Sequence, residues 1–108
     1  MREIEVQLPW FQHLVLGAKT VEGRKATPKW TSLQIGEHVI FTCLQQRCEF
    51  VITRLIVYKS CEEYLQQEGI QKCLPGISII EEGLKIYGQW YTQDELERSF
   101  LAIGVKLI

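Results

Sequence analysis

The stretch Glu37-His-Val-Ile-Phe-Thr-Cys-Leu44, followed after three residues by Cys48-Glu-Phe-Val-Ile-Thr-Arg-Leu-Ile-Val-Tyr58, decides the fold class. Both segments are rich in β-branched and aromatic residues, which favour strands. The polar residues Gln45, Gln46 and Arg47 between them fit a tight hairpin connection. We therefore predict two strands joined as a β-hairpin.

Three further segments flank this hairpin. Residues 2–8 alternate apolar with charged or polar side chains, the period of a half-buried strand, and Phe100–Leu107 alternates again and should close the sheet. Residues 18–26 are polar and basic and contain few core residues, which predicts a loop or an edge strand.

Helices are predicted on both sides of the hairpin. Pro9 suits the first turn of a helix that has an apolar face and ends near Gly17, and a short helical turn should span 28–33. In the back half, three matches to the capping box begin at Ser60, Ser78 and Thr92, each with Glu three residues later. They predict helices near 61–68, 79–88 and 93–98. The order of strands and helices indicates an α+β fold.

Length and composition predict a single domain over 1–108. The chain has 108 residues, 46% of them hydrophobic, which is enough for one core. Its formal net charge of −1 argues against a general nucleic-acid or membrane coat, which carries a basic excess. Residues 1–59 are nevertheless weakly basic, with eight Lys and Arg against five Asp and Glu, and residues 60–98 are acidic. A basic front half could face phosphate.

The cellular location and the absence of a metal are also inferred from local patterns. No apolar run approaches the roughly 18 residues of a membrane span, and charged residues interrupt the N-terminus, so we expect neither a membrane segment nor a signal peptide. The four cysteines lie mostly in apolar or helical patterns, which favours reduced thiols in an intracellular protein. Cys43 and Cys48 have no second Cys or His pair at zinc-finger spacing, so no metal or cofactor is predicted.

The sharpest local motif is Gly17-Ala-Lys-Thr-Val-Glu-Gly-Arg24. If it is extended, Thr20, Glu22 and Arg24 point to one side, and Lys19 lies just after the first helix. Cations can bind phosphate or carbonyl oxygens, and the carboxylate can accept from a base N–H or a water. The alternative is a solvated loop whose charges pair with each other for less than about 1 kcal/mol.

The same motif resembles the signature of the ASCH family, which is related to the PUA fold of RNA-modifying proteins. The segment Trp30-Thr-Ser-Leu-Gln-Ile-Gly-Glu37 resembles the step by which the family enters its barrel. The resemblance continues through the back half, in the segments that begin at Ser60, Leu74, Glu81 and Trp90. It implies a small PUA-like mixed β-barrel with short flanking helices, and RNA or a nucleotide as the ligand.

Glu68 is a second candidate site residue. It lies in the last turn of a predicted helix that Gly69 ends, where the negative end of the helix dipole disfavours a carboxylate by a few tenths of a kcal/mol. Residues placed against local preference are expected more often at functional sites. The alternative is an exposed glutamate with a small penalty.

One bacterial branch of the ASCH family hydrolyses acetylcytidine with a Lys, a Thr and a Glu. The resemblance carries its Lys to Lys19 and its Glu to Glu68, but its catalytic Thr falls on Glu22. Thr20 is a nearby hydroxyl that does not occupy the matching position. A carboxylate cannot replace a hydroxyl nucleophile without changing the mechanism, so this departure favours binding over hydrolysis.

Two functions remain open from the sequence. The first is a module that binds RNA or a nucleotide through a Lys/Glu/Arg cleft; the second is a small amidohydrolase acting on an acetylated nucleoside, or an RNA-cleaving enzyme. The candidate catalytic residues are Lys19, Glu22 and Glu68. The candidate ligand contacts are Thr20, Arg24, Lys25 and Trp30; Trp30 is preferred among five conspicuous aromatic residues because it lies close to the basic loop.

Overall fold

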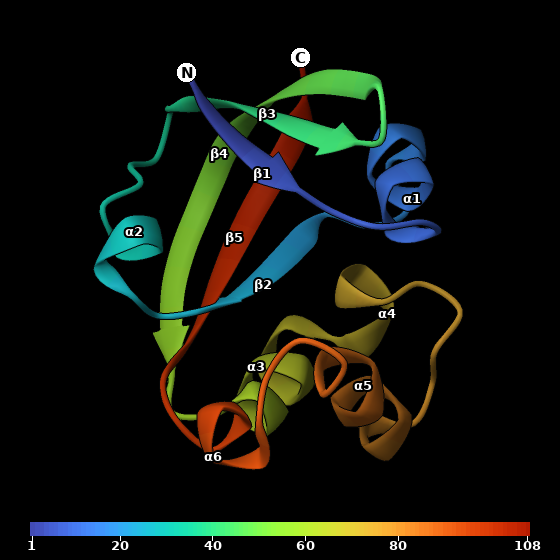
Figure 1. Cartoon of the computed structure of the whole chain (residues 1–108), viewed down its shortest axis with the longest axis vertical. Helices are drawn as coiled ribbons and strands as arrows, with labels where there is room; N and C mark the ends of the chain where they lie inside the picture. Colours follow the sequence, from blue (N-terminus) through green and yellow to red (C-terminus); the bar gives the residue numbers. More distant parts are fainter.

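A five-stranded, strongly curled sheet forms a half-barrel, and short helices cover one end of it (Figure 1). The computed structural model describes all 108 residues. The strands are β1 Arg2–Glu5, β2 Val21–Lys25, β3 His38–Cys43, β4 Gln46–Tyr58 and β5 Phe100–Leu107, in the order β1-β3-β4-β5-β2. The predicted α+β, PUA-like class is confirmed, although the strand order leaves the sheet open between β1 and β2.

The hairpin is tighter than the sequence suggested. Cys43 pairs with Gln46, so the turn consists of Leu44 and Gln45, and the predicted three-residue turn over 45–47 is wrong. Two-residue turns with positive φ match the twist of paired strands, and Leu44 adopts a φ of 55°. Gln46 and Arg47 therefore belong to β4.

A bulge in β4 divides its side chains between two cores. Ile52 pairs with Val105 and Arg54 pairs with Gly104, so Thr53 is the extra residue. Since side chains alternate along a strand, one extra residue exchanges the faces beyond it. Phe50 and Ile52 thus point into the curl of the sheet, and Ile56 and Tyr58 point toward the helices.

Strand β5 contributes to both cores. Its Leu101, Ile103 and Val105 pack inside the curl with residues of β1, β3 and α1. Its Phe100 and Ala102 pack on the other face with the helices of the back half. Burial on both faces explains why this strand is apolar almost throughout.

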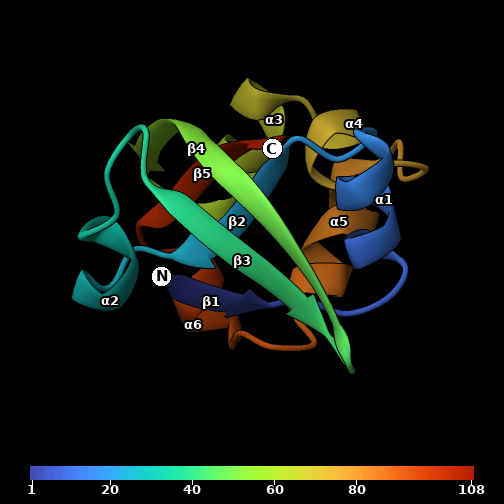
Figure 2. The same ribbon diagram turned by 90° about the horizontal axis from the view of Figure 1, so that it is seen from above.

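The helices are α1 Trp10–Leu16, α2 Pro28–Thr31, α3 Cys61–Glu68, α4 Ile70–Cys73, α5 Ile80–Tyr87 and α6 Gln93–Leu96. Figure 2 shows α1 on the same side of the sheet as α4 and α5, with α2 at the opposite side. None of these helices has the length and apolar composition of a membrane span. Segment 18–26, predicted as a loop or an edge strand, contains the edge strand β2.

The three predicted capping boxes differ in outcome. Thr92 forms the complete box, because its hydroxyl accepts from the Glu95 N–H and the Glu95 carboxylate accepts from the Thr92 N–H. The Ser60 hydroxyl accepts from the Glu63 N–H, but the Glu63 carboxylate accepts from the Lys59 N–H. The capping box predicted at Ser78 is wrong, because α5 begins one residue later, with Ile79 at the N-cap position, and no side chain caps it.

This difference is testable with two matched substitutions. Thr92→Ala removes a hydroxyl that caps α6 and should lower the free energy of unfolding by about 1 kcal/mol. Ser78→Ala removes an exposed hydroxyl that caps nothing and should change it by less than about 0.5 kcal/mol. Urea unfolding followed by circular dichroism measures both, and equal losses would contradict the assigned helix starts.

Candidate functional site

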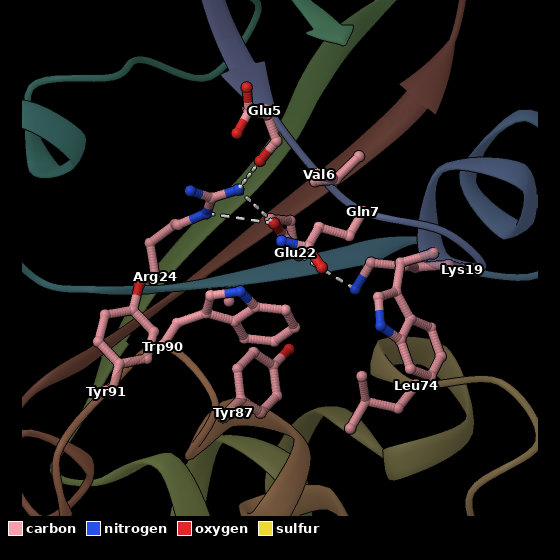
Figure 3. Close-up of a pocket in the computed structure, with 12 residues that line it drawn as sticks. Glu5, Val6, Gln7, Lys19, Glu22, Arg24, Leu74, Tyr87, Trp90 and Tyr91 are labelled. Atoms are coloured by element: carbon pink, nitrogen blue, oxygen red, sulfur yellow. Dashed lines mark hydrogen bonds and ion pairs between the residues drawn. The ribbon is translucent and has the colours of Figure 1, made fainter. Parts of the chain in front are cut away.

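A cavity lies at the open seam of the sheet, between the unpaired edges of β1 and β2. Its volume is about 210 Å³. Residues 5–7 and 22–24 line the two edges, and side chains from α1, α5 and the segment after α5 close it from the helical side (Figure 3). The cavity therefore exists because the half-barrel does not close.

Lys19 forms one end of the polar floor of the cavity. Its side chain is 1% exposed, and its ammonium donates to the carbonyl oxygens of Val21 at 2.7 Å and Cys73 at 2.5 Å. The Glu22 Oε1 lies 3.2 Å from the same nitrogen. An ammonium group has three donors, so these three partners occupy all of them.

Glu22 lies between two cations (Figure 3). Its Oε1 faces Lys19, and its Oε2 accepts from Arg24 through Nε at 3.2 Å and Nη2 at 2.8 Å. Burial opposes ionisation of Glu22, but Lys19 and Arg24 outweigh it and hold the pKa of the carboxyl below its usual value. Burial likewise opposes the charge of Arg24, and Glu22 reverses that effect and raises the pKa of the guanidinium. Glu22 and Arg24 are therefore both charged at neutral pH.

Arg24 also spans the open seam. Its Nη2 donates to the Glu5 carbonyl oxygen on the edge of β1 at 2.6 Å. Its guanidinium carbon lies 5.2 Å from the centre of the Trp30 ring, within the range of a cation–π interaction. Arg24 thus joins the two sheet edges that do not hydrogen-bond to each other.

Aromatic side chains wall the cavity opposite this polar floor. Trp10, Tyr87, Trp90 and Tyr91 all line it, and Trp90 is the most exposed of them at 43%. The Tyr87 hydroxyl lies 2.8 Å from that of Tyr64, and burial raises the pKa of both phenols well above the usual value. The wall is therefore neutral at physiological pH.

The structure brings together only part of the predicted site. Lys19, Glu22 and Arg24 line one cavity. Thr20 and Lys25 do not line it, and the Lys25 ammonium pairs with Glu95. Trp30 does not line it either, and its ring packs against Arg24.

Glu68 is not part of the cavity lining, contrary to the expectation that it shares a cleft with Lys19. Its side chain is fully buried, and its Oε2 accepts from Arg54 Nη2 at 2.9 Å and from the Tyr58 hydroxyl. Burial, and then this hydrogen bond, raises the pKa of Tyr58 to about 12. Arg54 and Tyr58 thus offset the unfavourable position of Glu68 at the helix end. Its Oε1 has no partner.

The sequence did not lead us to expect that Gly23 and residues 5–7 line the cavity. Gly23 lines the cavity without a side chain, and Glu5 at the end of β1 and the following Val6 and Gln7 line it from the other edge. A Cβ on Gly23 would lie 2.6 Å from Tyr64 Cζ, so that position requires glycine. A glycine inside a strand is a known sign of close approach, and this was the available signal.

Comparisons with known proteins agree with this architecture. The family model of the ASCH domain matches residues 4–106, and the chain belongs to this family. No curated protein matches the chain. Among solved structures, hypothetical protein PH0355 is 31% identical with a TM-score of 0.90, and the match covers 100% of both chains.

Two further solved structures share the fold. Protein PF0455 from Pyrococcus furiosus is 25% identical with a TM-score of 0.77, over 99% of this chain and 96% of the other. The ZmASCH protein from Zymomonas mobilis is 12% identical with a TM-score of 0.69, over 96% of this chain and 66% of the other. At that identity the likeness to ZmASCH shows the fold alone.

The lowered pKa of Glu22 predicts a specific dependence of stability on pH. Its ionised form stabilises the fold above its ordinary pKa of 4.5, and this contribution is lost as pH falls through the lower native value. Glu22→Gln should therefore lower the melting temperature strongly at pH 7 and much less at pH 3. Thermal unfolding of both proteins across this range measures the effect.

The matched control is Glu97→Gln, which changes an exposed carboxylate without a buried cation. Its melting temperature should follow that of the unaltered protein at every pH. A constant difference between Glu22→Gln and the unaltered protein would contradict the assigned pairing of Glu22.

Proposed function

We propose that this domain binds a single nucleobase, from RNA or from a free nucleoside, in the cavity at the open seam. The observation that carries the proposal is the pairing of an aromatic wall with a buried polar floor. Aromatic side chains stack on bases, and polar groups at the base edge fix the orientation. The family membership supports the same ligand class, since the ASCH fold is related to RNA-binding PUA domains.

The size of the cavity favours a base over a whole nucleotide. Pockets for drug-sized ligands measure roughly 300–1,000 Å³, and this cavity is smaller, at about 210 Å³. A flat heterocycle between Trp10, Tyr87 and Trp90 suits this volume. The sugar and phosphate would then lie at the mouth, near the exposed edge of Trp90.

The charges of the floor favour a neutral ligand. Lys19 and Arg24 both pair with Glu22. A phosphate in the cavity would have to displace Glu22 from one of these cations. We therefore revise the expected roles of Lys19 and Arg24 from phosphate ligands to the support of Glu22 and of the seam.

Hydrolysis of an acylated nucleoside is the second candidate, because Lys19 and Glu22 lie in contact at the cavity floor. In that reaction Glu22 would activate water and Lys19 would stabilise the oxyanion. The lowered pKa of Glu22 makes it a weak base, and Lys19 has no free donor. Glu68 is outside the cavity lining, so the geometry favours binding.

Calorimetric titration with the four common ribonucleosides tests the binding proposal. At least one should bind, and Trp90→Ala should weaken its binding by about 5-fold to 150-fold, because stacking on one aromatic residue contributes roughly 1–3 kcal/mol. Trp90 is half exposed, so this change should leave the fold intact.

Trp30→Phe is the matched aromatic control. It keeps a ring beside Arg24 and lies outside the cavity lining, so the affinity should not change. Absence of binding by any nucleoside and by short single-stranded RNA would refute the proposal. If Trp30→Phe weakens binding as much as Trp90→Ala does, the ligand must bind near α2 and not in the cavity.

Incubation with acetylcytidine separates binding from hydrolysis. The binding proposal predicts that the base moiety binds and that no acetate is released above the protein-free rate. Release of acetate that disappears in Glu22→Gln would establish the second candidate. Circular dichroism of Glu22→Gln is the control for its folding, because this residue is buried between two cations.

A further inference from the structure

Two cations from different elements lie around one aromatic ring beside the cavity. The Arg24 guanidinium carbon lies 5.2 Å from the centre of the Trp30 ring, and the Lys29 ammonium lies 4.8 Å from it. Both distances are within the range of cation–π interactions. Arg24 lines the cavity from β2, and Lys29 and Trp30 belong to α2. The Trp30 ring therefore holds a second cation close to the Arg24 end of the cavity.

The Lys29 ammonium has no carboxylate partner. Arg2, whose guanidinium donates to the Lys29 carbonyl oxygen, lies 3.6 Å from the Glu37 carboxylate. The Lys29 side chain is exposed and contacts the Trp30 ring, and it forms no ion pair. A lysine ammonium on its flexible four-carbon stem can move from the ring to an anion that offers it hydrogen bonds. Lys29 is therefore available to a ligand.

Arg24 also has donors that the protein does not use. Its Nε and Nη2 donate to Glu22, and Nη2 also donates to the Glu5 carbonyl oxygen. Its Nη1 has no partner, and Figure 3 shows this nitrogen directed away from Glu22. A guanidinium is a rigid fork of five donors. Arg24 can therefore support Glu22 and the seam with one side of the fork and bind an anion with the other.

The formal charges around Arg24 leave a positive excess. Lys19 and Arg24 together carry one positive charge more than Glu22, the carboxylate that they share. Lys29 adds a second charge without a partner. The opposing group is the Glu5 carboxylate, which forms no ion pair and belongs to the residue whose carbonyl oxygen binds Arg24. One formal positive charge remains, which favours an anion here.

We propose that Arg24 and Lys29 form a phosphate subsite, so that this site prefers a phosphorylated nucleotide to the free nucleoside. The inference rests on the proposed function, because it adds a phosphate to the base bound in the same cavity. The base occupies the cavity, and the phosphate lies outside it, where Arg24 adjoins Trp30. Phosphate oxygens accept charge-assisted hydrogen bonds from Arg24 Nη1 and from Lys29. Glu22 keeps both of its cations, since Nε and Nη2 of Arg24 are not needed for the phosphate.

Calorimetric titration at low salt compares each nucleoside with its 5′-monophosphate and its 3′-monophosphate. One of the two monophosphates should bind about threefold to tenfold more tightly than the nucleoside, because it gains contacts with one exposed and one largely buried cation. The favoured position of the phosphate gives the direction of the sugar across the mouth of the cavity. Equal affinities of the nucleoside and both monophosphates would overturn the inference.

Two variants should change the ratio of monophosphate to nucleoside affinity in opposite directions. Lys29→Gln removes one of the two cations and should lower this ratio about twofold to fivefold. Glu5→Gln removes the opposing carboxylate, keeps the carbonyl oxygen that binds Arg24, and should raise the ratio. A variant that unfolds loses affinity for both ligands and does not raise the ratio. An unchanged ratio in both variants would refute the subsite.

Lys106→Gln is the matched control for Lys29→Gln. Lys106 is an exposed lysine near one end of β5, and Leu101, the strand partner of Arg24, lies near the other end. This variant should keep the ratio of monophosphate to nucleoside affinity. If Lys106→Gln and Lys29→Gln lower the ratio equally, net charge and not a local subsite attracts the phosphate, and the inference is wrong.

Short single-stranded RNA distinguishes a nucleotide within a chain from a free one. Each phosphate neutralised on a single strand contributes about −0.7 to the slope of log affinity against log salt concentration. If the phosphate belongs to RNA, Lys29→Gln should make that slope less negative by about 0.7. If monophosphates bind more tightly than nucleosides but RNA does not bind, the subsite stands and its ligand is a free nucleotide.

The failure of this inference differs from the failure of the proposed function. If neither nucleosides nor their monophosphates nor RNA bind, the cavity is not a base site and both are refuted. If nucleosides bind and Trp90→Ala weakens their binding, but a phosphate adds no affinity, the base site remains and the phosphate subsite is refuted.

Discussion

The buried carboxylate of Glu22 is the constraint on which the open side of the half-barrel depends. It lies on an edge strand, directed into the curl of the sheet, where an unpaired charge would be strongly unfavourable. Lys19 and Arg24 neutralise it, and Arg24 continues to the edge of β1. Arg24 thus bridges the two edges of the seam, and the three side chains form the floor of the cavity.

The bulge at Thr53 lets β4 contribute side chains to a second core, which lies between the sheet and the helices. It turns the far half of β4 toward the helices, so that Tyr58 packs there and Arg54 reaches Glu68. The residues that cover the cavity, notably Tyr87, are held by this helical core through the contact with Tyr64. Glu68 thus pairs with Arg54 and Tyr58 and does not line the cavity.

Two features of the seam belong to the backbone. The strand order leaves the facing edges of β1 and β2 unpaired. Gly23 lines the cavity at a point where a Cβ would lie 2.6 Å from Tyr64 Cζ. The ZmASCH protein keeps the same fold at 12% identity.

The sequence by itself determined most of the strands and helix positions, because β-branched content, capping residues and strand alternation are local properties. Lys19, Glu22 and Arg24 were predicted as a set from the resemblance of their motif to the ASCH family, and the structure places all three at one cavity. The tertiary structure decided what depends on register and contacts between distant residues. The bulge at Thr53 sets the partners of Glu68, and the segment after α5 brings Trp90 into the cavity. Neither has a local signal, since each follows from how strands far apart in sequence pair and how the helices pack on them.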